Sequence, residues 1–449
     1  MAFDNSFIQY KVILKITNMK RRWLCKCKST NPSFLMIVLI AGITIISSLT
    51  FAPFITIQYV LAQPSIIKDP TLKAESIISG LSSPTSMAFL DNNQILVLEK
   101  GGQVRLVSNG QLQPQPVLQV SVNTESERGL LGIATMPGGG SQGGSSSGGG
   151  KITTTVFLYY TEADPLRNRV YKYQLNGQSL VNPTLILDLP AEPGPNHDGG
   201  KLAIGPDNYL YAIIGDLNHD GQLQNFADGP APDDTSGIFR INRDDGSPAA
   251  NNPFAQSGNN LLSKYYAYGI RNSFGMDFDP LTNNLWDTEN GPASYDEINL
   301  VRPGFNSGWQ KIMGPISISG HSEDQLVKFP NSKYADPVFS WKEPVAITDI
   351  EFMKSSKLGV NYQNNIFVGD INNGNLYFFK VNKDRTGVEL DSNQPTGVAD
   401  LVVDNNDELS SITFGTGFGG ITDIQTGPDG LLYILSYNDG NIYRISSQS

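Results

Sequence analysis

The stretch LAIGPDNYLYAII, residues 202–214, contains two short apolar runs that flank the turn Gly205-Pro206-Asp207-Asn208. Glycine and asparagine tolerate left-handed backbone, proline presets φ, and aspartate bonds to nearby backbone N–H groups. Val-, Ile- and Tyr-rich runs of this length favour strands over helices. The stretch therefore predicts two antiparallel strands joined by a tight turn.

The same pattern recurs along the chain. Each unit starts with an apolar triplet, and the triplets begin at Met87, Ile133, Leu202, Met276, Ile350 and Ile424, with spacings of 46, 69, 74, 74 and 74 residues. A single small sheet cannot bury both of its faces, whereas six sheets around one axis bury one another. We therefore predict an all-β fold, a six-bladed β-propeller; the alternative, a two-sheet sandwich, explains six long units less well.

Two further segments bear on this fold. Residues 74–79 are expected to provide the strand that closes the ring onto the last unit. Gly138–Gly150 reads GGGSQGGSSSGGG, and Gly/Ser runs of this kind behave as flexible coil. We expect it to be a surface loop between two strands of the second unit.

Charge is unevenly distributed over the 449 residues. Residues 1–63 hold seven Lys/Arg and one acid, so the remaining 25 basic and 42 acidic residues give the rest of the chain a net charge of −17. A protein that binds a phosphate backbone needs a basic surface. The composition therefore disfavours nucleic acid as a partner, and it supplies oxygen ligands for hard cations such as calcium.

The N-terminal segment predicts a membrane connection. A basic leader, residues 1–33, precedes an apolar run, residues 34–62, which is long enough to cross a bilayer. We expect a transmembrane or signal-anchor helix that places the propeller, residues 63–449, on the extracytoplasmic side. Cleavage near Ala62 is the alternative, and it would release a secreted protein.

Two short motifs carry candidate catalytic groups. His197 lies in a loop directly before the third apolar triplet, where a neutral imidazole could act as a general base. Arg271 and Asn272 hold the matching position one repeat later, and this arginine could polarise a carbonyl or pair with a carboxylate. The alternatives are an ordinary surface histidine and a structural arginine between blades.

An acidic stretch indicates a calcium site. Residues 287–297 contain Asp287, Glu289, Asp296 and Glu297 around Gly291-Pro292, whose carbonyls the turn leaves free. Calcium accepts both carbonyl and carboxylate oxygens. The alternative is a turn with acidic edges. The sequence has no P-loop and no HExxH, and it has no Rossmann fingerprint or Gly-x-Ser-x-Gly elbow in a strand–turn–helix setting, which disfavours the corresponding enzyme classes.

Taken together, these motifs resemble the glucose/sorbosone dehydrogenase family, whose soluble members are pyrroloquinoline quinone (PQQ)-dependent aldose sugar dehydrogenases. The resemblance runs from about Gly80 to Ile445. It rests on ERGLLG (127–132), NH (196–197), GKLAIGPD (200–207), IIGD (213–216), GIRNSFG (269–275), ENGPASYDEINL (289–300) and PGFNSGW (303–309).

The resemblance implies a role for each matching residue. His197 would take the proton of the sugar C1 hydroxyl while hydride passes to the quinone, so that an aldose becomes a lactone. Arg271 would stabilise the developing oxygen charge. Asn272 and Glu127 would contact the cofactor and Asn196 the sugar. The carbonyls of Gly291 and Pro292 would bind calcium, and an external acceptor would take the electrons.

The chain also departs from the family pattern. Glu127 and Phe274 stand where characterised members have glutamine. A cofactor-pairing lysine is replaced near Asn372, and two arginines are replaced by Gly420 and Thr422. PQQ carries three carboxylates, and each lost charge-assisted bond costs about 1–3 kcal/mol. These losses favour a second hypothesis, a non-redox propeller that binds carbohydrate or protein; a calcium-dependent lactonase is a third.

Overall fold

The computed structural model describes residues 65–137, 154–389 and 398–448, all within one compact unit, Ala62–Ser449. The predicted leader (1–33), membrane span (34–62) and Gly/Ser loop (138–150) lie outside the described residues, so those predictions stay untested. Within the described ranges, no helix has the length and apolar character needed to cross a membrane.

The described strands form six sheets, the number of repeat units in the sequence, and the prediction of an all-β propeller is confirmed. Sheets 1, 2 and 3 follow in chain order. Sheet 1 comprises β3 (Pro84–Asp91), β4 (Gln94–Glu99), β5 (Gln103–Ser108), β6 (Gln111–Leu112) and β7 (Leu118–Gln119). Sheet 2 comprises β8 (Leu130–Met136), β9 (Thr155–Ala163), β10 (Leu166–Asn176) and β11 (Ser179–Leu189). Sheet 3 comprises β12 (Leu202–Ile204), β13 (Leu210–Ile214), β14 (Gly237–Ile241), β15 (Tyr265–Tyr268), β19 (Phe305–Asn306) and β20 (Lys333–Tyr334).

Sheets 4, 5 and 6 complete the set. Sheet 4 comprises β16 (Gly275–Phe278), β17 (Leu285–Glu289), β18 (Asp296–Val301), β21 (Phe339–Trp341) and β26 (Val402–Val403). Sheet 5 comprises β22 (Ile347–Phe352), β23 (Ile366–Asp370), β24 (Leu376–Val381), β25 (Val388–Glu389), β27 (Thr413–Thr416) and β1 (Ile66–Ile67). Sheet 6 comprises β28 (Ile421–Thr426), β29 (Leu432–Ser436), β30 (Asn441–Ser447) and β2 (Leu72–Ile78). Between the strands lie the short helices α2 (Ile316–Ser319) and α3 (Asn406–Ile412) and the 3-10 turns η1 (Gln222–Gln224), η2 (Leu262–Lys264) and η3 (Glu323–Gln325).

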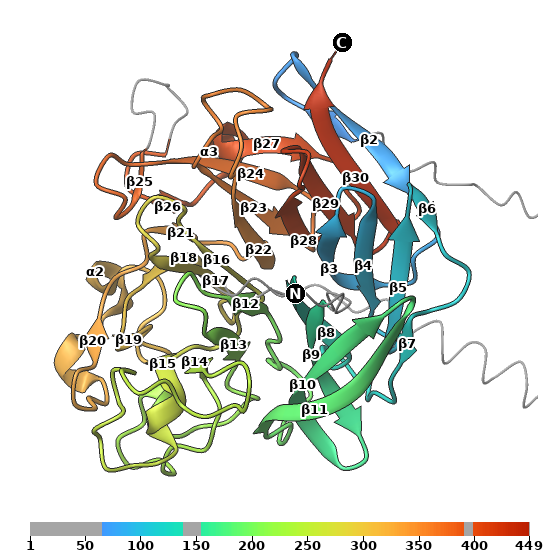
Figure 1. The fold of residues 1–449 in the computed structure, drawn as a ribbon. Helices are drawn as coiled ribbons and strands as arrows, with labels where there is room; N and C mark the ends of the chain where they lie inside the picture. Colours follow the sequence, from blue (N-terminus) through green and yellow to red (C-terminus); the bar gives the residue numbers. More distant parts are fainter. Residues whose placement is uncertain (1–64, 138–153, 390–397, 449) are drawn as a thin grey trace, which may run out of the picture. The chain divides into compact units, whose positions relative to one another are not determined.

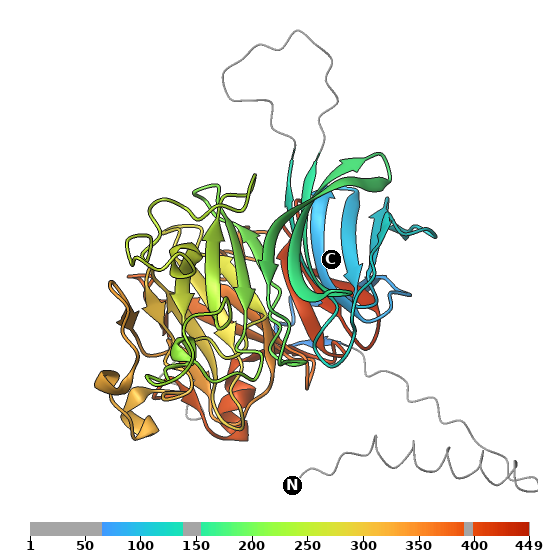
Figure 2. The same ribbon diagram turned by 90° about the horizontal axis from the view of Figure 1, so that it is seen from below.

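The six apolar triplets all lie in the first, innermost strands, β3, β8, β12, β16, β22 and β28, around a common centre (Figure 1). Each of these strands contacts the next, and β28 contacts β3, so the ring is closed. The closing strand is also confirmed, because β2 pairs antiparallel with β30 and aligns Ala74 with Ile445. Figure 2 shows the two ends of the described chain, in blue and red, side by side.

Six apolar clusters fill the spaces between neighbouring sheets. In β4, for example, Leu96 and Leu98 pack toward sheet 2, whereas Ile95 and Val97 pack toward sheet 6. Successive side chains of a strand point to opposite faces. Both faces of β4 are therefore buried, which explains why residues 95–98 are apolar without interruption.

Carboxylates also connect the innermost strands. Asp277 accepts a hydrogen bond from the backbone N–H of Phe352, and Asp349 accepts one from Ile424, at 2.9 and 2.8 Å. Asp423 accepts one from Met87 at 2.6 Å, across the junction of the last and first sheets. These bonds fix the relative heights of neighbouring sheets, and thereby of the loops at their ends.

Candidate active site

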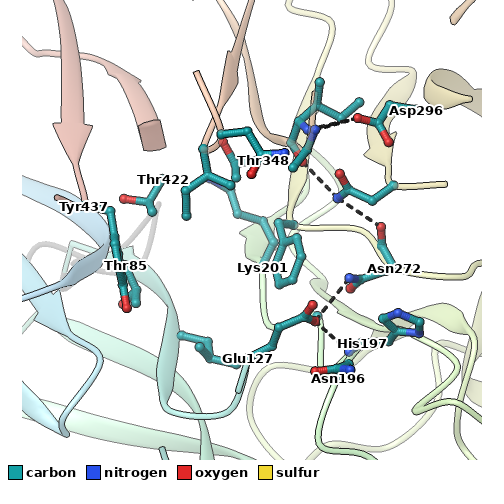
Figure 3. A pocket seen from close by; sticks show the side chains of 18 of the residues that line it. Thr85, Glu127, Asn196, His197, Lys201, Asn272, Asp296, Thr348, Thr422 and Tyr437 are labelled. Atoms are coloured by element: carbon teal, nitrogen blue, oxygen red, sulfur yellow. Dashed lines mark hydrogen bonds between the residues drawn. The ribbon is translucent and has the colours of Figure 1, made fainter. Parts of the chain in front are cut away.

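A cavity of about 640 Å³ lies where residues of all six sheets, or of the loops that enter them, approach one another (Figure 3). Glu127, Asn196, His197, Arg271, Asn272 and Gly291, six of the seven predicted site residues, line it; Pro292 is exposed and is not among the lining residues. The propeller explains this grouping, because the loop before each innermost strand reaches the same central region.

His197 is held in one orientation. Its backbone has φ +66°, and its side chain is 6% exposed. Its Nδ1 lies 2.5 Å from Oδ1 of Asp216, which follows β13. A carboxylate accepts a hydrogen bond, so Nδ1 carries the proton and Nε2 keeps its lone pair. No hydrogen bond to Nε2 occurs among the described residues, so this nitrogen is available as a base.

Asp216 is itself fixed by further donors. The backbone N–H of Asn218 donates to Oδ1 at 2.8 Å, and the indole Nε1 of Trp309 donates to Oδ2 at 2.6 Å. The backbone N–H of Asp216 donates to the carbonyl of Arg271 at 2.8 Å. Asp216 therefore joins the loops that carry His197 and Arg271. Asp216 ends the IIGD motif, and the motif alone did not indicate this role.

Glu127 connects three loops at the cavity wall. One of its oxygens, Oε2, accepts the backbone N–H of His197 at 2.6 Å and the side-chain amide of Asn272 at 3.1 Å (Figure 3). Glutamate and glutamine can both accept these bonds. Glu127 thereby ties the loop of His197 to the loop of Asn272.

Arg271 is a half-buried cation without a matching anion. Its guanidinium donates to the carbonyl of Asn290 at 2.8 Å and lies 5.2 Å from the ring centroid of Trp309, and Nε has no hydrogen-bond partner. It forms no ion pair within the described ranges. Burial lowers its pKa, although Asp216 and Glu289 oppose this effect. An oxyanion in the cavity would satisfy it.

Asn196 lies at the cavity edge beside Ser126, whose hydroxyl donates to the Asn196 carbonyl oxygen. The free Nδ2 group of Asn196 can donate to a ligand hydroxyl. This position is consistent with a contact to sugar.

The predicted calcium residues divide into two groups. Gly291 lines the cavity, and its backbone N–H donates to Asp296, whose other oxygen accepts from the backbone N–H groups of Val345 and Ala346. A Cβ at Gly291 would lie 2.1 Å from the carbonyl oxygen of Ser294, so only glycine fits there. Among the described residues, no three His, Cys, Asp or Glu side chains form a metal-binding group. The calcium role of the Gly291 and Pro292 carbonyls stays a prediction.

The other three acids of that stretch lie inside sheet 4. Asp287, Glu289 and Glu297 are buried, with Glu289 directly opposite Glu297 in the β17–β18 ladder. Burial raises the pKa of Glu289 to about 7 and raises those of Asp287 and Glu297 well above their usual values. None of the three lines the cavity.

Two lysines that the sequence analysis did not single out also line the cavity. Lys100, in the β4–β5 turn, donates to the carbonyl of Ser126 and forms no ion pair within the described chain. Lys201, directly before β12, reaches across the centre to Asp349 at 2.7 Å and Asp423 at 3.0 Å. Asn372 and Thr422, where the family's cations are missing, both line the cavity; Lys100 offsets this loss in part, whereas the charge of Lys201 is taken up by its two aspartates.

This arrangement supports acid–base and electrostatic chemistry on a polar ligand. The oriented imidazole of His197, the guanidinium of Arg271 and several amide side chains line one cavity. Such a set can remove a hydroxyl proton and stabilise an oxygen that gains negative charge. The fold and the site together are those of a β-propeller protein whose central cavity is lined by an oriented imidazole and a guanidinium without an ion-pair partner in the described chain.

Comparison with known proteins identifies the family. The family model described as Glucose / Sorbosone dehydrogenase matches residues 81–444. The chain therefore belongs to the glucose/sorbosone dehydrogenase family, and it is a sugar dehydrogenase-like oxidoreductase of the kind that acts on CH–OH groups.

Individual relatives agree with this assignment. The chain is 26% identical to the aldose sugar dehydrogenase YliI of Escherichia coli, over 84% of this chain and 94% of the relative. It is 27% identical to the quinoprotein glucose dehydrogenase B of Acinetobacter calcoaceticus, over 63% and 62% of the two chains. The PQQ-bound aldose sugar dehydrogenase of Streptomyces coelicolor shares the fold, with a TM-score of 0.61 at 23% identity, over 86% of this chain and 99% of that one.

Proposed function

We propose that the protein is a PQQ-dependent aldose dehydrogenase that oxidises the C1 hydroxyl of a sugar to a lactone and passes electrons to an external acceptor. The observation that carries this proposal is the pairing, in one cavity, of the free Nε2 of His197 with the unpaired guanidinium of Arg271. The family assignment and the quinoprotein relative support the choice of cofactor.

The residues present suit such a cofactor. Arg271 and Asn272 both line the cavity, and within the described residues Nε of Arg271 and Oδ1 of Asn272 have no hydrogen-bond partner. Lys100 and Arg271, both without an ion-pair partner in the described chain, can receive two of the three PQQ carboxylates or quinone oxygens. The carbonyls of Gly291 and Pro292 would hold calcium beside it. PQQ, when bound, supplies the two-electron acceptor for the hydrogen on C1.

The chain's own residues handle the proton and the charge. His197 Nε2 takes the proton of the C1 hydroxyl, while Asp216 on Nδ1 stabilises the imidazolium that results. The C1–H bond breaks with both of its electrons as the C1–O bond becomes the carbonyl of the lactone. Arg271 provides a fixed positive charge at the wall, and Asn196 orients the sugar through its free amide N–H groups.

The proposed location is the extracytoplasmic side of a membrane. The basic leader, residues 1–33, and the apolar run, residues 34–62, support an uncleaved anchor. Mass spectrometry of the protein from the membrane fraction tests this part: an intact N-terminus supports the anchor, and a start near residue 63 indicates a secreted protein.

Titration of the full chain with PQQ tests the proposed function. With calcium present, we expect a Kd for PQQ of about 1 μM or tighter, which corresponds to a binding free energy of about −8 kcal/mol. The loaded protein should then reduce a dye when an aldose is added. Chelation of calcium with EDTA should abolish dye reduction. If the folded protein shows no PQQ binding at about 1 mM, the binding free energy is weaker than about −4 kcal/mol. The proposal then fails.

A change at Lys100 tests the cationic part of the site. Lys100→Met should weaken PQQ binding about 10-fold. A charge-assisted hydrogen bond contributes about 1.5–3 kcal/mol, but the partial exposure of Lys100 and screening by salt reduce this contribution. The salt dependence of Kd should also become flatter. The matched control is Lys383→Met, an exposed lysine outside the cavity. If Lys100→Met and the unmodified protein bind PQQ with equal affinity at low and at high salt, Lys100 does not contact the cofactor.

A further inference from the structure

Trp309 lies behind the cavity wall and contacts both chemical groups of the site. Its indole Nε1 donates to Oδ2 of Asp216 at 2.6 Å, on the oxygen opposite to the one that holds His197. The centroid of its ring lies 5.2 Å from the guanidinium carbon of Arg271. Trp309 is not among the cavity-lining residues, so its effects reach a ligand only through these two neighbours.

The backbone of Trp309 is held on both sides. Its N–H donates to the carbonyl of Gly269 at 3.2 Å, and its carbonyl accepts the side-chain amide of Asn225 at 2.7 Å. Gly269 precedes Arg271 by two residues and has φ +76°; a Cβ there would lie 2.2 Å from Oδ1 of Asn306. The loop after β19 and the loop that carries Arg271 are therefore locked together, which leaves the indole little freedom.

The two contacts act on His197 and Arg271 in complementary ways. The indole N–H occupies Oδ2, so the Asp216 carboxylate cannot rotate away from His197 without losing a hydrogen bond. This keeps the proton on Nδ1 and the lone pair on Nε2. The ring face supports a guanidinium that has no ion-pair partner in the described ranges, and cation–π attraction grows when the cation is shielded from water.

We propose that Trp309 is a positioning residue that couples the general base to the oxyanion-stabilising cation, through Asp216 on one side and its ring face on the other. This inference rests on the proposed function for its kinetic consequences. Its structural part, the tautomer of His197, does not depend on any bound cofactor.

Two variants separate the contacts. Trp309→Phe keeps an aromatic face under Arg271 and removes the N–H, whereas Trp309→Leu removes both. We expect Trp309→Phe to lower kcat about 10-fold with little change in KM, by analogy with the roughly 10–100-fold losses that follow removal of a hydrogen-bond partner behind a metal-ligating histidine. Trp309→Leu should in addition weaken PQQ binding several-fold, because Arg271 loses the aromatic ring that its guanidinium packs against.

The matched control is Trp286→Phe. Trp286 is fully buried, and its indole N–H has no hydrogen-bond partner. This change therefore reproduces the smaller ring and the lost N–H without touching the site, and it should leave kcat unchanged.

A spectroscopic readout keeps the test independent of activity. In protein labelled with ¹⁵N-histidine, without PQQ, we expect His197 to show a single tautomer protonated at Nδ1, and a mixture of tautomers in Trp309→Phe. If Trp309→Phe does not fold, slow hydrogen exchange of the Trp309 indole N–H in the unmodified protein is the remaining test, and fast exchange overturns the proposal.

The outcomes distinguish this inference from the proposed function. A single Nδ1-protonated tautomer and a normal kcat in folded Trp309→Phe would overturn the role of Trp309. An unmodified protein that binds no PQQ and oxidises no aldose would overturn the proposed function, while the tautomer measurement would still decide whether Trp309 positions Asp216 and His197.

Discussion

Replacement of His197 by asparagine is expected to lower kcat about 10²- to 10⁴-fold, the usual contribution of a positioned general base. Asparagine suits this test better than alanine, because His197 has φ +66° and asparagine tolerates left-handed backbone. Its amide can also keep a hydrogen bond to Asp216. The variant therefore removes the base and preserves the loop, and the measurement is steady-state dye reduction with PQQ, calcium and an aldose.

His321→Asn is the control for this change. His321 lies on an exposed loop and bonds only to Gln325 through its side chain, so its loss should leave kcat unchanged. PQQ affinity should change little in His197→Asn, because the cations of the site remain. If His197→Asn retains more than about a tenth of the kcat, another group removes the proton and the assigned base is wrong.

Replacement of Lys201 by methionine should destabilise the folded protein by about 3–5 kcal/mol, the cost of removing one partner from a buried ion pair. Only 11% of the Lys201 side chain is exposed, and it lies between Asp349 and Asp423. Those carboxylates also accept backbone N–H groups of sheets 6 and 1. The variant leaves two carboxyl groups at the centre of the ring without the cation that lies between them, and denaturant unfolding measures the loss of stability.

The pKa values of Asp349 and Asp423 predict how the loss of stability in Lys201→Met depends on pH. Burial and Asp423 raise the pKa of Asp349 well above its usual value. Burial opposes ionisation of Asp423 as well, but Lys201 and hydrogen bonds outweigh it and lower the pKa of Asp423. Without Lys201, both carboxylates protonate more readily. The difference in the free energy of unfolding between the unmodified protein and Lys201→Met should therefore be largest at neutral pH and smaller near pH 5.

Lys354→Met is the matched control for Lys201→Met. Lys354 also bridges two carboxylates of neighbouring sheets, Asp277 and Glu351, but 44% of its side chain is exposed. Exposed ion pairs contribute about 0–1 kcal/mol. A double variant, Lys201→Met with Asp349→Asn, should recover part of the stability. Equal small losses for both lysine variants would show that the central cluster is not a buried ion pair.

The sequence predicted the fold because the fold depends on short-range patterns. Each apolar triplet with its turn is a local signal, and six of them at similar spacing require a closed ring to bury their faces. The triplets lie in the six innermost strands, and residues 74–79 overlap the closing strand β2. The family was also recognisable from sequence, since its motifs occur in order between residues 127 and 309, and the family model matches residues 81–444.

The site was predicted in part, through position relative to the triplets. His197 and Arg271 each precede a triplet, and that placement brings both to the cavity. Lys201 directly precedes its triplet as well, but no pattern in the chain indicates that its amine crosses the centre to Asp349 and Asp423. Lys100 and Trp309 lie in turns and loops whose direction depends on packing between sheets.

By itself, then, the sequence determined the strands, the repeat, the closure of the ring and the residue types at the entry of each innermost strand. Only the tertiary structure decided which of these groups touch. Glu127 meets His197 and Asn272 across 70 and 145 residues, and Trp309 meets Asp216 across 93. Such contacts depend on how far each sheet is rotated and shifted against the next, and this geometry is set by side-chain packing between the sheets, which the spacing of the repeat does not specify.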